Sequence, residues 1–488
     1  MVDERKTECG RSTCRLSGTR DRPYSRIISR LLVTRAVPVG GLAVWFSLTL
    51  VGICSAETFK LMDALAFAYE TNPQLAQARA ALAALDQGVA QANAGWRPSL
   101  NATTSYGYDR ATVTGFSTPL ETHPVVGQVT LSQPVYRGGQ TYAEISRAEQ
   151  LDRAGQAQLV STEQSVFLSA TTAYADVVRD LALLDVAHDN ARALDAEARD
   201  VHTEFSAGEV TRTDVQQADA RLARARANEA VSESQLAASR AEYEDVIGRP
   251  AETLEKEVGL PSLPGSKDAA LQIALKENPD LNAARASERA ADFAIADAVG
   301  AMLPQISILG QYQYLHDAAN ESVFGIPAEQ RVASVVAQLN VPIYQGGGEE
   351  AAVRRAKDTH EQAELAISTA ERGVRQNLDS AWETFHALEV AVAADRAQSA
   401  ASQSAVAGMK EQQRGGERSV INVLDAQQDF FFAETSLEQS LHDQALAAFR
   451  LLAATGQLTA EHLQLRVTLY DPQVHYNDNA NAWFGLGK

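Results

Sequence analysis

The chain contains the same module twice, and this duplication constrains its fold more than any other feature of its 488 residues. A segment that begins at Asn72 reads NPQLAQARAALAALDQGVAQANAGWRPSL, and a related segment, NPDLNAARASERAADFAIADAVGAMLPQI, begins at Asn278, 206 positions later. Further matches follow at a spacing of 208, where PVYRGG begins at Pro134 and PIYQGG at Pro342. This unit is too long for a solenoid repeat, so we expect two similar halves around a pseudo-twofold axis.

Each half contains a long stretch without proline, from 135 to 249 and from 343 to 471. Alanine, glutamine, leucine and charged residues dominate both stretches, a composition that favours long helices. Apolar residues recur at steps of three and four between Phe167 and Phe205, with one extra step of three. This is the heptad pattern of a coiled coil with one stammer. A helix over residues 140–205 would be roughly 100 Å long at ~1.5 Å per residue, so it must pack laterally against other helices.

Glycines mark the points where each long helix is expected to reverse its direction. Gly208 ends the first helix, and Gly415 and Gly416 end the second, because glycine readily adopts the backbone conformation that terminates a helix. Returning helices are then expected over 211–247 and 418–455. Each is about half as long as its partner, and the helices that open the two halves supply the missing length, over residues 72–95 and 278–301.

The hydrophobic period changes to two between each opening helix and each long helix. Larger side chains alternate with small or polar ones from Leu100 to Tyr108 and from Val125 to Ser132, and the second half repeats both patterns. These segments predict two strand hairpins, with strands of about 11 to 13 residues, which suits tilted strands of a membrane barrel. An exposed hairpin on a soluble protein would show the same alternation. Four strands cannot close a barrel, so either several chains donate four each or the strands lie outside a membrane. Tyrosines are the candidates for the membrane interface: Tyr106, Tyr108, Tyr136, Tyr312, Tyr314 and Tyr344.

The first 56 residues have the pattern of a secretory signal peptide. A basic stretch precedes the apolar run 37–53, and Cys54-Ser55-Ala56 forms a small-x-small cleavage pattern. A start of translation near Val33 is a hypothesis that N-terminal sequencing tests, and a retained membrane anchor is the structural alternative. Lipidation at Cys54 is disfavoured because a bulky isoleucine precedes it.

Composition excludes several classes of function for the processed chain. All three cysteines, Cys9, Cys14 and Cys54, lie in the leader, so the rest of the chain has neither a disulfide nor a thiolate. Removal of the leader leaves 34 basic and 58 acidic residues, a net charge of −24, which disfavours nucleic-acid binding. The nine histidines show no metal-ligand spacing, and the phosphate-binding and nucleophile motifs are absent. We therefore expect no catalytic residue, metal or cofactor, and no enzyme activity.

These observations predict five segments. They are a signal peptide (1–56), a first repeat (57–258), a linker (259–267), a second repeat (268–456) and a C-terminal tail (457–488). The tail has no duplicate in the first half, and it either packs around the helices or trails from them.

The duplicated NPxL helix, the PVYRGG and PIYQGG junctions, and the tips FSAGEVTRTDVQQA and QRGGERSVINVLDAQ resemble the TolC family of outer-membrane factors. The resemblance covers residues 58–456. It implies a mainly α fold with a transmembrane β portion: a homotrimer whose 12 strands, four per chain, form a barrel in outer-membrane lipid and whose helices form a periplasmic tunnel. It also implies a periplasmic adaptor and an inner-membrane ABC or RND-type transporter, for type I protein secretion or small-molecule efflux by a Gram-negative bacterium. The alternative is a periplasmic or secreted coiled-coil spacer.

The resemblance also assigns a periplasmic gate to residues of the hairpin tips, namely Thr213, Asp214, Gln413, Arg418, Asn422 and Asp425. It implies that Arg418 pairs with Asp214 and that three copies of Asp425 ring a constriction and attract cations. Gln413 stands where the family has a tyrosine, and Asn422 where it has an aspartate. We therefore expect weaker closure on the tyrosine side and one carboxylate per chain in the ring.

Overall fold

The computed structural model describes residues 59–112, 114, 119–317, 327–483 and 485. The predicted signal peptide, with its cleavage pattern and Cys54, lies outside the described residues. All described elements belong to one compact unit, Ala56–Lys488. Within the described part of this unit, no helix combines the length and the apolar character needed to cross a membrane.

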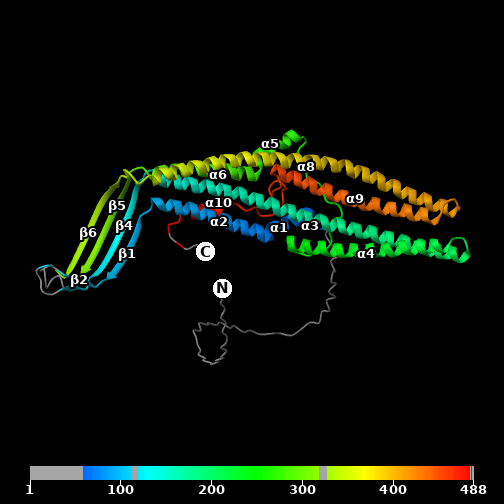
Figure 1. The fold of residues 1–488 in the computed structure, drawn as a ribbon, viewed down its shortest axis with the longest axis horizontal. Coiled ribbons are helices and arrows are strands. Elements are labelled where there is room, and N and C mark those ends of the chain that lie inside the picture. Colours follow the sequence, from blue (N-terminus) through cyan, green and yellow to red (C-terminus); the bar gives the residue numbers. More distant parts are fainter. Residues whose placement is uncertain (1–58, 113, 115–118, 318–326, 484, 486–488) are drawn as a thin grey trace, which may run out of the picture. The chain divides into compact units, whose positions relative to one another are not determined.

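Both halves have the same order of elements: two short helices, paired strands and a long helical hairpin (Figure 1). The first half contains α1 (Leu61–Thr71), α2 (Pro73–Asn93), the 3-10 turn η1 (Ala94–Trp96), β1 (Ser99–Tyr106), β2 (Asp109–Ala111), β3 (Leu120–Thr122), β4 (Val125–Arg137), α3 (Gln140–Ala207) and α4 (Arg212–Ile247). The second half contains α5 (Lys267–Glu277), α6 (Pro279–Gly300), β5 (Gln305–His316), β6 (Glu329–Asn340), α8 (Gly348–Arg414) and α9 (Val420–Thr455), and α10 (Pro472–Asn479) follows in the tail. The predicted mainly helical fold with four principal strands is confirmed.

The opening of each half differs from the prediction, because two helices stand where one was expected. The predicted helices correspond to α2 and α6, whereas α1 and α5 were missed. Asn72 separates α1 from α2, and its side-chain oxygen accepts hydrogen bonds from the backbone N–H groups of Gln74 and Leu75. Asn278 caps α6 in the same way, and a proline follows each asparagine at the first helical position. The repeated Asn-Pro pair therefore ends one helix and starts the next.

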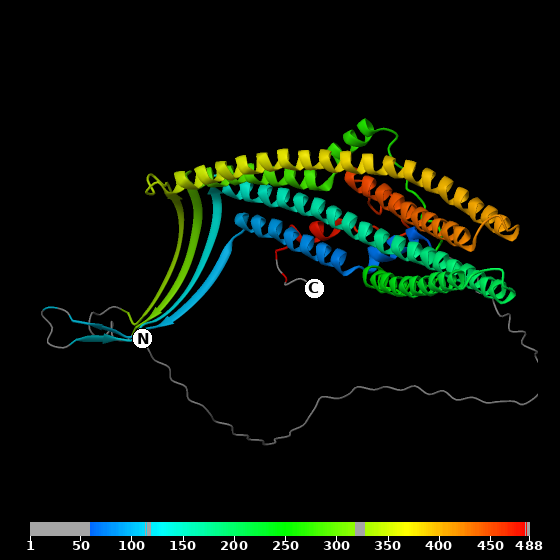
Figure 2. The same cartoon turned by 45° about the vertical axis from the view of Figure 1, so that its right-hand side comes forward.

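The four principal strands form one antiparallel sheet in the order β1-β4-β5-β6, so the two predicted hairpins meet at the β4–β5 pair. A short separate pair, β2–β3, extends the first hairpin. Gly138 and Gly139 in the first half, and Gly346 and Gly347 in the second, have positive φ angles and lead the chain from the sheet into α3 and α8. Figure 2 shows the sheet continuing from one end of the long helices. No residue of β1 or β6 is buried, so the outer strands have no core within the chain.

The main core forms where α3 passes α1, α2, α4 and the tail. Phe167, Tyr174 and Tyr243 are completely buried there. The predicted apolar stripe of α3 is buried or half-buried from Phe167 to Val201. Phe205, the last residue of the stripe, is 45% exposed within one chain.

The tail packs against the first half of the chain, which decides between the two arrangements left open above. Leu458 and Ala460 are buried in the main core. The backbone N–H of Tyr470 donates to the Tyr69 hydroxyl at 3.0 Å, and α10 lies against α2. The tail therefore covers a surface whose counterpart in the second half has no equivalent cover.

A buried pair of carboxyl groups lies where α10, α2 and α3 meet. Asp86 and Asp152 are 1% and 4% exposed, and His475 Nδ1 lies 2.6 Å from Asp86 Oδ2. Gln156 donates a hydrogen bond to Asp152 at 2.8 Å. Burial raises the pKa of Asp152 to about 7, and the hydrogen bond and charge of Asp86 act in the same direction. A large share of the Asp152 carboxyl groups is therefore protonated near neutral pH, and the protonated group can donate a hydrogen bond to Asp86.

Asp152→Asn is predicted to stabilise the protein at pH 8 relative to the wild type, by on the order of 2 kcal/mol, and to have less effect at pH 5. The folded pKa of Asp152 lies above its ordinary value of 3.8, so protonated Asp152 stabilises the fold at low pH and this contribution is lost as the pH rises through about 7. Thermal unfolding of the detergent-solubilised protein at both pH values measures the difference. The control is Asp185→Asn on the exposed face of α3. A constant difference between wild type and Asp152→Asn across this range would contradict the raised pKa of Asp152.

Candidate functional site

The tips of the two helical hairpins lie next to each other, at the end of the helices opposite the sheet (Figures 1 and 2). The first hairpin turns at Gly208, whose φ of 82° is favourable only for glycine. The second turns through Gly415 and Gly416, of which only Gly416 has a positive φ, at 76°. An alanine would therefore be strained at Gly208 and Gly416 but tolerated at Gly415.

Identical capping arrangements start the two returning helices. The backbone N–H of Thr211 donates to Asp214 Oδ2 at 2.8 Å, while the backbone N–H of Asp214 donates to the Thr211 hydroxyl at 3.4 Å. Ser419 and Asn422 form the same box 208 positions later, with the Ser419 N–H donating to Asn422 Oδ1 at 3.3 Å. Asp214 and Asn422 thus occupy equivalent positions, and each caps its own helix. Because an amide oxygen accepts as a carboxylate does, Asn422 keeps this structural role without a charge.

The described residues of one chain do not join Arg418 to Asp214. Arg418 Nε donates to Gln412 Oε1 at 3.3 Å within its own tip, and the Thr213 side chain is exposed. The pairing implied by the family resemblance would therefore have to form between different chains.

An ion pair that the sequence did not indicate links the two hairpins. One guanidinium nitrogen of Arg221, on α4, lies 2.8 Å from Asp425 Oδ1, on α9. The other donates to Gln428 Oε1 at 3.3 Å. Arg221 lies two turns after Asp214 on α4, so both residues lie on the same face of that helix. This spacing is the signal in the sequence that could have indicated Arg221. Asp425 is consequently not an isolated negative charge.

A second polar link joins α3 to α8. Glu197 is 8% exposed, and its burial raises its pKa, while the positive charge of Lys410 and a hydrogen bond from Gln413 lower it. Gln413, which replaces the family tyrosine, therefore contacts the other hairpin through Glu197. Between the two links lies an apolar cluster of α3, α4 and α9, made by Ala191, Leu194, Ala198, Val201, Val215, Ala218, Ala225, Val420 and Leu424.

This arrangement allows the tips to separate at low energetic cost. The side chains of Arg221 and Asp425 are 31% and 57% exposed, so their ion pair contributes only about 0–1 kcal/mol. The apolar cluster is built mainly from small residues and valines, which bury little area each. The contacts between the tips are therefore weaker than those of the large aromatic core around Tyr174, which joins helices further along the hairpins.

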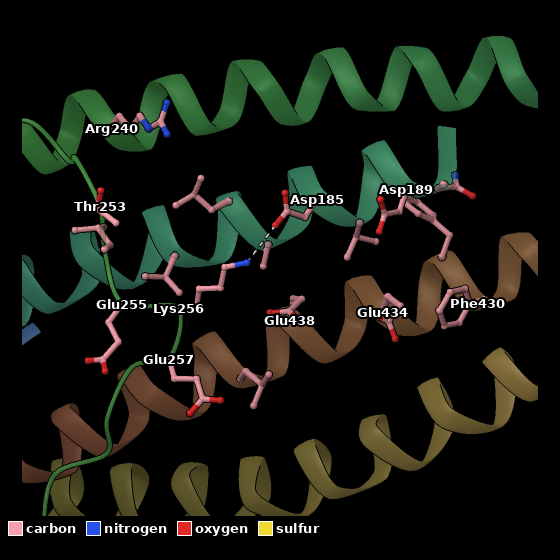
Figure 3. A pocket seen from close by; sticks show the side chains of 18 of the residues that line it. Asp185, Asp189, Arg240, Thr253, Glu255, Lys256, Glu257, Phe430, Glu434 and Glu438 are labelled. Carbon is pink, nitrogen blue, oxygen red and sulfur yellow. Dashed lines mark ion pairs between the residues drawn. The ribbon is translucent and has the colours of Figure 1, made fainter. Parts of the chain in front are cut away.

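A cavity of about 810 Å³ lies further from the tips, between α3, α4, α9 and the segment 252–257 (Figure 3). Lys256 reaches into it from this segment, with Nζ 3.7 Å from Asp185 Oδ2. Arg240 is the other basic residue of its lining. Carboxylates outnumber both, contributed by Asp185, Asp189, Glu252, Glu255, Glu257, Glu434 and Glu438. The cavity therefore disfavours anionic ligands such as phosphates.

Comparisons of the sequence and of the structure with known proteins both find outer-membrane proteins. A family model described as outer membrane efflux protein matches residues 65–249 and 270–457. The outer membrane efflux protein BepC of Brucella suis is 32% identical over 428 residues, which cover 87% of this chain and 91% of that protein. The outer membrane protein TolC of Vibrio cholerae is 24% identical over 401 residues, or 81% of this chain and 90% of that protein.

The solved structure of the outer membrane protein VceC from Vibrio cholerae shares the fold, with a TM-score of 0.70 at 18% identity over 81% of this chain and 96% of that one. The two segments matched by the family model coincide with the two copies of the internal repeat. These similarities favour an outer-membrane channel over a free coiled-coil spacer, and the chain belongs to the outer membrane efflux protein family.

Proposed function

We propose that three copies of this chain form one passive export duct, with a barrel of 12 strands in the outer membrane and a helical tunnel in the periplasm. The observation that carries this proposal is the open four-stranded sheet, whose edges β1 and β6 have no partner strand among the described residues. An open edge in lipid would leave backbone groups without hydrogen bonds. Pairing of β6 with β1 of the next chain removes both edges and closes the barrel.

The side chains of the sheet support its insertion into lipid. Val335 is 79% exposed, Leu100 69% and Leu339 62%, although all three are large apolar residues. Apolar surface of this extent is uncommon on a soluble monomer, but it is expected on the outer face of a membrane barrel. Tyr106 and Tyr344, near opposite ends of the sheet, are also exposed and suit the two membrane interfaces.

The duct itself supplies no energy, so we propose that it works with an energised partner. A periplasmic adaptor and an inner-membrane transporter of the ABC or RND type fit this arrangement. The names of its relatives include both efflux proteins and the proteases secretion protein PrtF of Dickeya chrysanthemi. The transported cargo is therefore either small molecules or proteins, and the wall of a passive duct need not recognise which.

We further propose that the hairpin tips form the periplasmic gate. Arg418 of one chain would pair with Asp214 of its neighbour, since neither side chain finds the other within one chain. Asp425 would face the axis with its charge partly compensated by Arg221. Repulsion among the three Asp425 carboxylates is then weaker than the sequence alone implies.

Insertion and trimerisation are expected together. The protein should fractionate with the outer membrane and migrate as a heat-modifiable oligomer in SDS gels, because closure of the barrel requires all three sheets. Heated and unheated samples of the processed protein provide the comparison. A monomer that remains in solution without detergent would contradict the proposal and favour the spacer alternative.

Arg221→Gln and Asp425→Ala are predicted to change cation block in opposite directions. Removal of Arg221 leaves the Asp425 charge uncompensated and strengthens block by trivalent cations added at the periplasmic side, whereas removal of Asp425 weakens it. Planar-bilayer recordings measure the half-blocking concentration. Arg226→Gln serves as the matched control, because Arg226 lies on the same helix but pairs with Asp195 of α3. Equal block in all four proteins would remove Asp425 from the constriction.

Arg418→Ser is predicted to raise the resting conductance of the channel, by loss of the proposed contact between chains. The control is Arg414→Ser, which removes an exposed arginine from the same tip that pairs with Glu411 of its own helix. Single-channel recordings at low salt are the most sensitive, since screening weakens exposed ion pairs. If both variants conduct like the wild type, Arg418 does not contribute to closure.

A further inference from the structure

We propose that Glu288, His360 and Glu364 form a binding site for one divalent transition-metal cation, of which Zn²⁺ is the representative probe. The site lies on α6 and α8, in the second half of the chain and away from the hairpin tips. It is independent of the export function proposed above.

The helices bring the three side chains together. His360 and Glu364 are four residues apart on α8 and so lie on one face of that helix. Helix α6 packs along α8 and places Glu288 opposite them, with Glu288 Oε1 2.9 Å from His360 Nε2. One ligand atom from each of the three residues lies within 4.8 Å of the others. Ligands bound to Zn²⁺ at ~2.0–2.2 Å are separated by roughly 3.3 Å, a distance that small rotations of the carboxylates can reach.

The donor set is selective for a particular class of ion. One imidazole nitrogen with two carboxylate oxygens suits Zn²⁺, Ni²⁺ or Cu²⁺, whereas Ca²⁺ and Mg²⁺ prefer oxygen ligands alone. Three protein ligands leave the fourth tetrahedral position to water. Glu364 is exposed, while the side chains of Glu288 and His360 are 23% and 21% exposed, so an ion can reach the site from solvent.

The other histidine–carboxylate contacts among the described residues do not bring three ligand atoms together, not even that of His442, whose two ring nitrogens contact Asp176 and Asp443 separately. His386 lies 2.6 Å from Glu389 on α8, and His188 lies 2.5 Å from Glu229. Neither belongs to a group of three metal-binding side chains among the described residues. The second carboxylate, Glu364, therefore distinguishes the proposed site from an ordinary surface ion pair.

The internal repeat relates the long-helix residues of the proposed site to the first half. At the spacing of 208 that relates the long helices, His360 corresponds to Asp152, and Glu364 corresponds to Gln156. In the first half Asp152 lies in the buried carboxyl pair, beside which His475 of the tail contacts Asp86. The partners on the opening helices are not equivalent, because at the spacing of 206 Glu288 corresponds to Leu82 and Asp86 to Asp292. The second half therefore joins its two helices about one turn away from the carboxyl pair, and it does so with a set of metal-binding side chains.

The test uses the full-length processed protein in detergent, with any affinity tag removed because histidine tags bind Zn²⁺. Equilibrium dialysis against a competing chelator measures how many Zn²⁺ ions each chain binds and how tightly. We expect one saturable site per chain, abolished in His360→Asn and weakened at least ~10-fold in Glu364→Gln. Glu364→Gln is the decisive variant, because it leaves the contact between His360 and Glu288 intact. His386→Asn is the matched control on the same helix and should bind like the wild type.

The absorption spectrum of bound Co²⁺ provides a second measurement, since a four-coordinate ion with one nitrogen ligand absorbs strongly in the visible range. Heat-modifiable migration and bilayer conductance should be unchanged in every variant, which separates failure of this site from failure of the proposed duct. The proposal is overturned if the wild type has no saturable site, if Glu364→Gln binds with unchanged affinity, or if His386→Asn loses as much binding as His360→Asn.

Discussion

The structure depends on lateral burial of the apolar stripe along α3. Most of the stability of a helix in a protein comes from packing of its apolar face, so a helix of 68 residues needs neighbours along its length. Helices α1, α2, α4, α6 and α9 do so in turn, and the tail completes the cover around Tyr174. Helix α8, which corresponds to α3 in the second half, contributes far fewer buried residues, chiefly Val374, Leu378, Phe385 and Val392. The two halves are therefore alike in topology but unequal in burial, and α8 keeps a large surface for other chains.

The difference in burial between the two halves explains which polar side chains are buried and which are accessible to solvent. In the first half the tail closes over α2, so Asp86 and Asp152 are buried, and burial raises the pKa of Asp152. In the second half the corresponding surface stays open, and Glu288, His360 and Glu364 remain accessible. At the tips the helices are joined by mostly small apolar residues and two polar links, whereas large aromatic residues fill the main core. This difference in packing is compatible with the gate proposed at the tips.

Much of the architecture was predictable because its determinants are local and occur twice. The Asn-Pro starts, the glycine turns and the alternating strands each have a short-range physical cause. Each of these features also occurs in both halves of the sequence, so each copy supports the interpretation of the other. The split of each opening region into two helices was missed, because Asn72 was taken only as a helix start and not also as the end of α1. At the tips, Asp214 and Arg418 were expected as partners. Within one chain Asp214 caps its own helix, Arg418 donates to Gln412, and Arg221 pairs with Asp425, so the expected pairing stays a prediction for neighbouring chains.

The periodic features of the protein are encoded locally in its sequence: two halves, long helices with reversals at glycine, and four strands with an apolar face. These follow from backbone preferences and hydrophobic period, which act within a few residues of the chain. The contacts between side chains of different elements, such as Glu197 with Gln413, Arg221 with Asp425, and Glu288 with His360, arise from the packing of the folded chain. Such contacts depend on the rotation and axial offset of one helix against another. Those two quantities are set by packing along the whole interface, and no short segment of the sequence encodes them.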